Sequence, residues 1–322
     1  MTSSQDTACC SRPASSPPSS TASAYAAHVS AAFSLAGLSA AWIAPSVNWE
    51  QQLDLDGFHR LTQAASLIFL AFFVASLWQS GRADDRRRER CFLVLAPLVV
   101  CQICVSNGQA WIPATIACGV LAVLCIAAML FAAGKAVVQK RRTVDGCIHV
   151  EALLPHGSAW SVLAISAERI GLLGAGRWFA WVAALSISFW AVSTFVRAPC
   201  PMDHTRRGRL GILVAVPSTL SLAFVPVEPT VARLVLVIAA LVAIVVLRSE
   251  TDWKAFGSNP SYWPYVFACS TLSQALWACS VTCFGGKLAG DVVFVIGNAL
   301  ALWILVRWTV RPIQPSNGVM AS

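Results

Sequence analysis

The stretch LVLVIAALVAIVVL, residues 234–247, is an uninterrupted apolar run bounded by Arg233 and Arg248. A helix needs about 20 predominantly apolar residues, with a lower limit of about 17, to cross the hydrocarbon core of a bilayer. With the preceding residues 231–233, this run predicts a membrane-spanning helix over residues 231–247. The whole chain has the same character, because 57% of its 322 residues are hydrophobic and only 12% are charged. A soluble domain carries about 25% charged residues. The bilayer is therefore the expected solvent for most of this chain.

Ten apolar segments have this character, and helices are the expected structure because a backbone in hydrocarbon must satisfy its own hydrogen bonds. We predict an all-α membrane protein whose ten transmembrane helices form five hairpins. The domain spans residues 25–312, between a disordered cytoplasmic tail at 1–24 and a short cytoplasmic tail at 313–322. The predicted spans are residues 26–44, 61–79, 91–105, 112–133, 154–173, 178–196, 210–225, 231–247, 263–283 and 292–310.

The basic residues between these spans alternate in number, and this alternation indicates the orientation. Of the 23 Lys and Arg residues, one set of loops and both termini hold about 18, the opposite loops hold about four, and Arg169 lies within the fifth span. Cytoplasmic loops carry the excess of Lys and Arg in membrane proteins. We therefore expect a multi-pass protein of the plasma or inner membrane with both termini in the cytoplasm. The net charge of +8 is assigned to topology, and no nucleic-acid partner is expected.

Odd-numbered and even-numbered spans differ in chemistry. The even spans are uniformly apolar, whereas the odd spans carry small and hydroxylated residues, including Ser218, Thr219 and Ser270. Polar groups that face lipid are costly, which favours an inner pore ring of five odd helices inside an outer ring of five even helices. For any single residue the simpler alternative is that its hydroxyl joins two helices.

Three prolines, Pro97, Pro217 and Pro264, all lie in odd spans. A proline in a helix interior removes one backbone hydrogen bond and kinks the helix. The freed carbonyl is tolerable only beside protein or water, so these residues are candidates for lining or bending a pore. Packing is the alternative, because membrane helices carry proline fairly often.

Several stretches resemble the tellurite-resistance/dicarboxylate transporter family, which includes the plant slow anion channels and the fungal malate and sulfite transporters. The ten-span plan is similar, and NPSYWPYVFACS (259–270) is similar to the aromatic entry of the family's ninth helix. Further similar stretches are AAFSLAGLSAAW (31–42), LPHGSAWSVLAISAERIGLLGAGRWFAW (154–181) and RLGILVAVPSTL (209–220), together with Pro97.

The resemblance implies a homotrimer with one pore per subunit, and an anion channel or transporter gated by an aromatic side chain. Phe267 is the residue that matches the family's pore-plugging phenylalanine. Without the resemblance, an ordinary packing role would be favoured for it. The expected partners are membrane lipid and small anions such as chloride, nitrate, a C4-dicarboxylate or an oxyanion.

The chain also departs from the family. It carries Glu168 and Arg169 where small residues are usual, and Gly157, Ser158 and Ala159 where Asn residues are common. Ionisable groups inside a span are functional candidates, and Arg169 is expected to attract anions at the outer mouth. A salt bridge or a side chain reaching toward the headgroups is an equal alternative.

Three other functions remain open. One is proton-coupled export of a dicarboxylate, sulfite or tellurite; the second is a membrane-embedded enzyme; and the third is a non-conducting scaffold. No HExxH or GxSxG motif occurs, and such motifs mark common metal and serine hydrolases. We expect no enzyme activity, no cofactor and no metal site.

Overall fold

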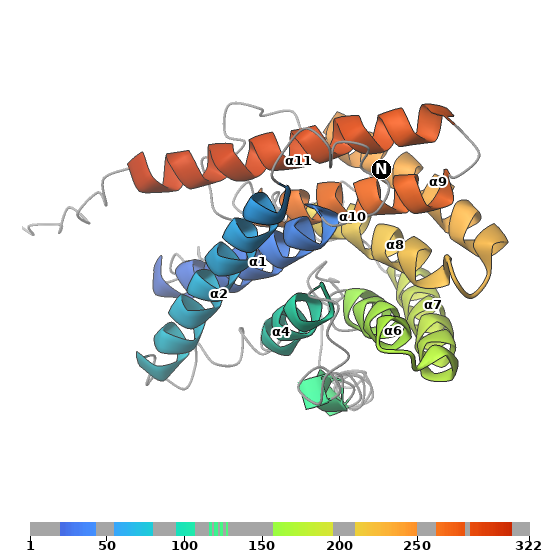
Figure 1. Cartoon of the computed structure of the whole chain (residues 1–322), viewed down its shortest axis with the longest axis horizontal. Coiled ribbons are helices and arrows are strands. Elements are labelled where there is room, and N and C mark those ends of the chain that lie inside the picture. The colour runs from blue at the N-terminus through green and yellow to red at the C-terminus, as the bar shows by residue number, and fades with distance from the viewer. Residues whose placement is uncertain are drawn as a thin grey trace, which may run out of the picture.

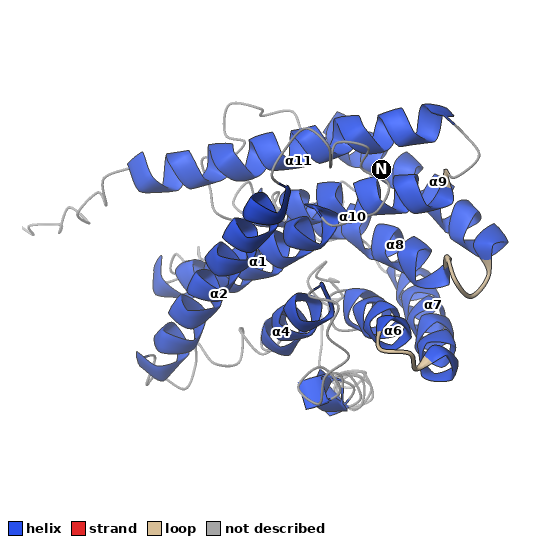
Figure 2. Cartoon of the chain, viewed as in Figure 1, coloured by secondary structure: helices blue, strands red, loops and turns tan. Residues whose placement is uncertain are grey.

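The computed structural model describes residues 20–42, 55–79, 95–106, 157–195, 210–249, 262–280 and 284–310, with scattered positions between 116 and 127. These residues form helices, with described turns between α6 and α7 and between α8 and α9, and none of them is in a strand (Figure 2). The all-helical prediction is therefore confirmed for the described part of the chain. The helices are α1 (Ser20–Trp42), α2 (Leu55–Gln79), α4 (Leu95–Ser106), α6 (Ala159–Arg169), α7 (Leu173–Phe195), α8 (Gly211–Phe224), α9 (Pro229–Ser249), α10 (Trp263–Cys279) and α11 (Phe284–Val310).

Several of these helices begin before the predicted spans do. Helix α11 begins at Phe284, although residues 285–291 were expected to form a loop. A hydrogen bond of 3.1 Å from Trp277 Nε1 to Asp291 Oδ1 joins its first turns to α10, so packing extends the helix beyond the apolar run. Helix α1 begins at Ser20, inside the tail expected at 1–24.

A tight turn ends α6 and starts α7. Gly171 has a φ of 86°, in the left-handed region that glycine enters without steric cost. The backbone N–H of Leu172 donates to Ala167 O at 2.8 Å, which closes the end of α6. Helix α6 therefore ends at Arg169, before the predicted limit of residue 173.

Successive helices pack as antiparallel pairs. In α1 and α2, Ser39 Oγ lies 3.1 Å from His59 Nδ1, and Ser66 Oγ donates to Ala32 O at 2.7 Å. Later residues of one helix thus meet earlier residues of the next. Helices α6 and α7, and likewise α10 and α11, also contact each other in antiparallel order. Helix α8 packs against α9. The chain around 112–133 is described only at scattered positions.

Five helices from alternate positions in the chain contact one another in a closed order. Helix α1 contacts α4 and α10, α4 contacts α6, α6 contacts α8, and α8 contacts α10 (Figure 1). Helices α1 and α10 run in the same direction, because Ser34 Oγ donates to Trp263 O at 2.8 Å and Gln274 Nε2 donates to Gly37 O at 3.3 Å. Helices α8 and α10 also run in the same direction, since Gly211 adjoins Pro264 and Ser221 Oγ lies 3.7 Å from Cys279 Sγ.

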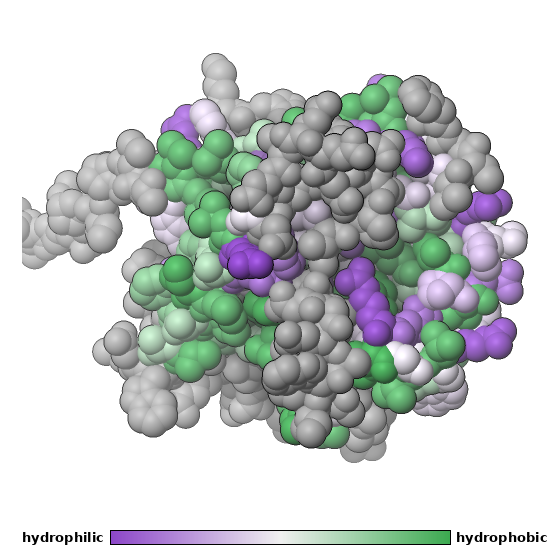
Figure 3. Space-filling view, viewed as in Figure 1, coloured by the Kyte–Doolittle hydropathy of each residue, from purple (hydrophilic) through white to green (hydrophobic). Residues whose placement is uncertain are grey.

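The remaining helices present apolar side chains outward. Among the described residues, the exposed large hydrophobic side chains of the helices lie mainly on α2, α7, α9 and α11, and none lies on α1, α6, α8 or α10. Hydrophobic residues accordingly cover much of the described surface in Figure 3. Exposed apolar surface of this extent marks contact with lipid or another apolar partner.

Three helical segments of the described chain are long and apolar enough to cross a membrane, namely Gly57–Ala75, Pro229–Arg248 and Gly285–Trp308. They belong to α2, α9 and α11, and they indicate membrane association. Two shorter apolar helical segments are Leu173–Phe189 and Gly211–Phe224. Residues 1–19 and 311–322, and the basic runs around Arg86 and Arg141, lie outside the described residues.

The contact between α8 and α10 depends on a glycine and provides a test of the fold. A Cβ on Gly211 would lie 2.6 Å from the backbone nitrogen of Tyr265 and 2.7 Å from the carbonyl carbon of Pro264. Backbone atoms cannot move aside as a flexible side chain can, so Gly211→Ala is expected to destabilise the fold by about 1–3 kcal/mol.

The measurement is the thermal unfolding midpoint of the purified protein in detergent. Gly174→Ala is the matched control, since nothing lies within 4 Å of a Cβ at that helical position. An unfolding midpoint in Gly211→Ala equal to that of the control would contradict this packing.

Candidate functional site

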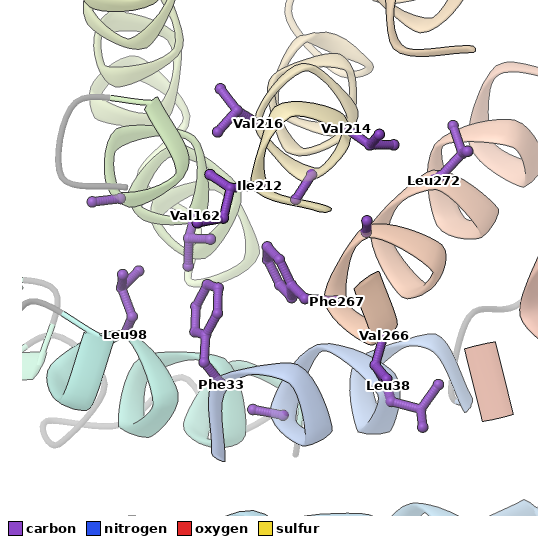
Figure 4. Packing of buried hydrophobic residues seen from close by; sticks show 14 of the residues in the cluster. Phe33, Leu38, Leu98, Val162, Ile212, Val214, Val216, Val266, Phe267 and Leu272 are labelled. Atoms are coloured by element: carbon purple, nitrogen blue, oxygen red, sulfur yellow. The ribbon is translucent and has the colours of Figure 1, made fainter. Parts of the chain in front are cut away.

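A layer of apolar side chains fills the space between the five helices that contact one another in closed order. We call it the apolar layer, and one residue comes from each helix (Figure 4). The rings of Phe33 and Phe267 lie at its centre, with their centroids 4.1 Å apart. Their exposed fractions are 3% and 2%, so water does not reach either ring. The layer consists of Phe33, Leu98, Val162, Ile212 and Phe267.

The position of the Phe267 ring depends on Gly37. A Cβ on Gly37 would lie 2.7 Å from Phe267 Cδ2 and 3.0 Å from Ser270 Oγ. Any larger residue would therefore press against the phenyl ring. Because Gly37 follows Phe33 by four residues, both face the same side of α1, and the two rings meet where that side of α1 approaches α10.

A cavity of about 250 Å³ lies on one side of the apolar layer. All five of these helices contribute to its lining, each with residues from its C-terminal part. Gly37 lies four residues after Phe33, Gln102 four after Leu98, and Thr271 four after Phe267, so the cavity begins one helical turn beyond the layer. The other lining residues are Ala40, Val162, Ile165, Ser166, Glu168, Arg169, Thr219, Leu222, Val225, Pro226, Gln274 and Ala278.

The two threonine hydroxyl groups of this lining donate to their own helices. Thr219 Oγ1 donates to Ala215 O at 3.0 Å or Val216 O at 2.9 Å. Thr271 Oγ1 donates to Phe267 O at 3.0 Å or Ala268 O at 3.2 Å. A hydroxyl has one proton and two lone pairs, so each oxygen remains available to accept a hydrogen bond.

Glu168 and Arg169 both line the cavity, at the end of α6. Gly176 of α7 makes room for the Glu168 side chain, since a Cβ there would collide with Glu168 Cγ. Arg169 is exposed. The cavity therefore combines one acidic and one basic side chain on adjacent positions of one helix.

Of the remaining predicted residues, Ser218 and Ser270 are fully buried but do not line the cavity. Ser218 Oγ donates to Val214 O at 2.8 Å and Ser270 Oγ to Phe267 O at 2.8 Å. The alternative that hydroxyls join helices applies to Ser34, Ser66 and Ser221, each of which donates to a carbonyl of a neighbouring helix.

The three prolines differ in position. Pro217 lies inside α8, where a backbone hydrogen bond to Leu213 O is lost. Pro264 instead lies in the first turn of α10, where a helix has no intrahelical donor to lose. Pro97 is the third described residue of α4, and the residues before Leu95 lie outside the described part of the chain. Pro217 is therefore the proline at which a lost hydrogen bond can be assigned, and Pro264 marks a helix start.

Sequence reasoning did not single out Phe33. The available signal was its spacing from Gly37, because an aromatic residue and a glycine four positions apart share one helix face. Among the described residues, no group of three or more His, Cys, Asp and Glu side chains is arranged to hold a metal ion.

No protein-family model matches the chain, and no curated protein matches its sequence. The apolar layer and the cavity beside it are therefore the features that bear on function.

The cavity predicts which of two neighbouring residues a polar reagent reaches. In Leu222→Cys the thiol would replace a partly exposed side chain that lines the cavity, whereas in Ser221→Cys it would be buried within the helix packing. A charged, membrane-impermeant methanethiosulfonate reagent is expected to label Cys at 222 and to leave Cys at 221 unmodified.

The measurement is peptide mass spectrometry of the purified protein in nanodiscs, which separates the new site from the 12 native cysteines. Equal labelling at 221 and 222 would show that the cavity does not have this lining.

Proposed function

We propose that this protein is an anion channel or transporter in which the apolar layer closes a path through the centre of each subunit. One observation carries the proposal. A cavity lined by residues of five helices lies beside the apolar layer, in which the rings of Phe33 and Phe267 are in contact with their centroids 4.1 Å apart. A cavity shared by every helix of the closed order is where a permeating ion would pass between them.

The physical problem for an ion is the loss of its hydration shell in a low-dielectric interior. A pore lowers this cost with polar groups and a favourable field, and an apolar constriction closes it by excluding water. In the proposed mechanism, Arg169 attracts the anion into the cavity and the Phe267 ring blocks onward passage. Movement of that ring away from Phe33 would open the path.

The proposal includes the arrangement in the membrane. Helices α1, α4, α6, α8 and α10 would form an inner ring, and the outward apolar faces of α2, α7, α9 and α11 support an outer ring in contact with lipid. The resemblance to the tellurite-resistance/dicarboxylate transporter family supports ten spans, cytoplasmic termini, location in the plasma or inner membrane, and a homotrimer.

A second candidate function is proton-coupled export of an anion. Glu168 favours it, because a carboxyl group that lines the cavity can bind and release a proton on the path of the substrate. Ionisable residues inside membrane spans serve as proton relays in pumps and transporters.

Removal of the proposed gate is expected to increase conduction. Phe267→Ala replaces a ring at the centre of the apolar layer with a methyl group, which leaves room for water. We expect anion current in planar bilayers to rise by roughly tenfold, because a hydrophobic constriction blocks ions by dewetting.

Phe294→Ala is the matched control, since Phe294 is also buried but packs against Trp42 and Trp277 outside the apolar layer. Its current is expected to equal that of the wild type. An unchanged current in well-folded Phe267→Ala would remove the gate from the mechanism.

Passive and coupled transport are separated by a pH gradient. If Glu168 carries a proton with the anion, an imposed gradient will drive uptake of radiolabelled malate into proteoliposomes, and Glu168→Gln will abolish the acceleration. Arg177→Gln, which alters an exposed residue outside the cavity lining, should retain it. Uptake that is independent of the gradient in the wild type would favour the passive channel.

A further inference from the structure

The donors and acceptors of the cavity lining are unequally available to a ligand. Thr219 and Thr271 use their single hydroxyl protons within their own helices. The Gln274 amide nitrogen donates to Gly37 O at 3.3 Å and to Ser270 O at 3.1 Å, which occupies both of its protons. Side chains that look like donors in the sequence therefore present mainly oxygen lone pairs to the cavity.

Two further lining residues add acceptor capacity. Glu168 presents a carboxyl group, which accepts through two oxygens when ionised. The Oε1 atom of Gln102 is buried and has no hydrogen-bond partner. A buried polar atom without a partner costs free energy. Rotation of the Gln102 side chain toward the cavity would allow this oxygen to accept a hydrogen bond from a ligand.

Arg169 supplies the positive charge of this lining and Glu168 the negative charge. A halide can pair with Arg169, but it has no proton to donate to the acceptors and is repelled by Glu168. A compact anion with a separate hydroxyl group can pair with Arg169 through its carboxylate or other oxyanion group and can also donate a hydrogen bond to the acceptors. Its anionic group would pair with Arg169, and its hydroxyl would donate to the Glu168 carboxylate.

We propose that the cavity is a binding site for small hydroxylated monoanions, with Arg169 holding the anionic group and Glu168, assisted by Gln102, accepting the ligand's hydroxyl proton. As a statement about the transported substrate this rests on the proposed function, because it names the class of anion that would enter the path. The occupancy of the site is nevertheless measurable without transport.

The experiment compares glycolate with acetate, which have the same charge at neutral pH and differ by one hydroxyl. Isothermal titration calorimetry of the protein in nanodiscs is expected to show glycolate binding about tenfold more tightly, as a hydrogen bond to a charged group implies. Glu168→Met should remove this preference, and Glu168→Gln, which keeps an acceptor oxygen, should retain part of it. Arg169→Gln should weaken the binding of glycolate and acetate by the same factor.

Arg177→Gln is the control for charge removal and should bind both ligands as the wild type does. Equal affinities for glycolate and acetate in the wild type, an undiminished preference in Glu168→Met, or tighter binding of methylammonium would each overturn the inference. Malate flux in proteoliposomes is measured separately. If malate is transported but glycolate does not bind more tightly than acetate, the proposed binding site is contradicted and the proposed transport function is not. If glycolate binds more tightly but malate is not transported, the transport function is contradicted and the binding site is not.

Discussion

The close approach of α1 to α10 is the contact on which the site depends. It requires a glycine at position 37, where any Cβ would meet the Phe267 ring, and it is held by hydrogen bonds from Ser34 to Trp263 O and from Gln274 to Gly37 O. If these helices separated by the width of a methyl group, the rings of Phe33 and Phe267 would lose their contact. The apolar layer and the cavity beside it therefore depend on one small residue, one buried hydrogen bond and one part-buried hydrogen bond.

The distribution of side chains over the helices follows from the solvent. Lipid tails are as apolar as leucine, so helices in a bilayer gain little by burying large hydrophobic residues and associate instead through small residues and hydrogen bonds. Helices α1, α8 and α10 bury serines and threonines, whereas α9 and α11 expose valine, leucine and isoleucine. The same logic explains Ser221, whose hydroxyl donates to Ala232 O across the turn between α8 and α9 at 2.8 Å.

Hydropathy was sufficient to predict helices and membrane association, because both depend on composition over many residues. Residue roles were less accessible. The hydroxyls of Thr219 and Ser270 were visible in the sequence, but their hydrogen-bond partners were not, since those depend on the rotamer that each side chain adopts. Pro264 was placed inside a span because helix ends are the least certain part of a sequence-based assignment. Phe33 was missed because its spacing from Gly37 shows only that the two residues share a helix face, and not which helix that face contacts.

The hydrogen bonds of Thr219 and Thr271 to their own helices also bear on how quickly an occupant leaves the cavity. When an occupant departs, these hydroxyl protons remain hydrogen-bonded to their own helices. Departure therefore leaves neither hydroxyl donor without a partner and needs no rearrangement of these two helices. In the proposed conduction path, such hydroxyl groups would favour a short residence of each ion, because an ion must leave its site before the next one enters.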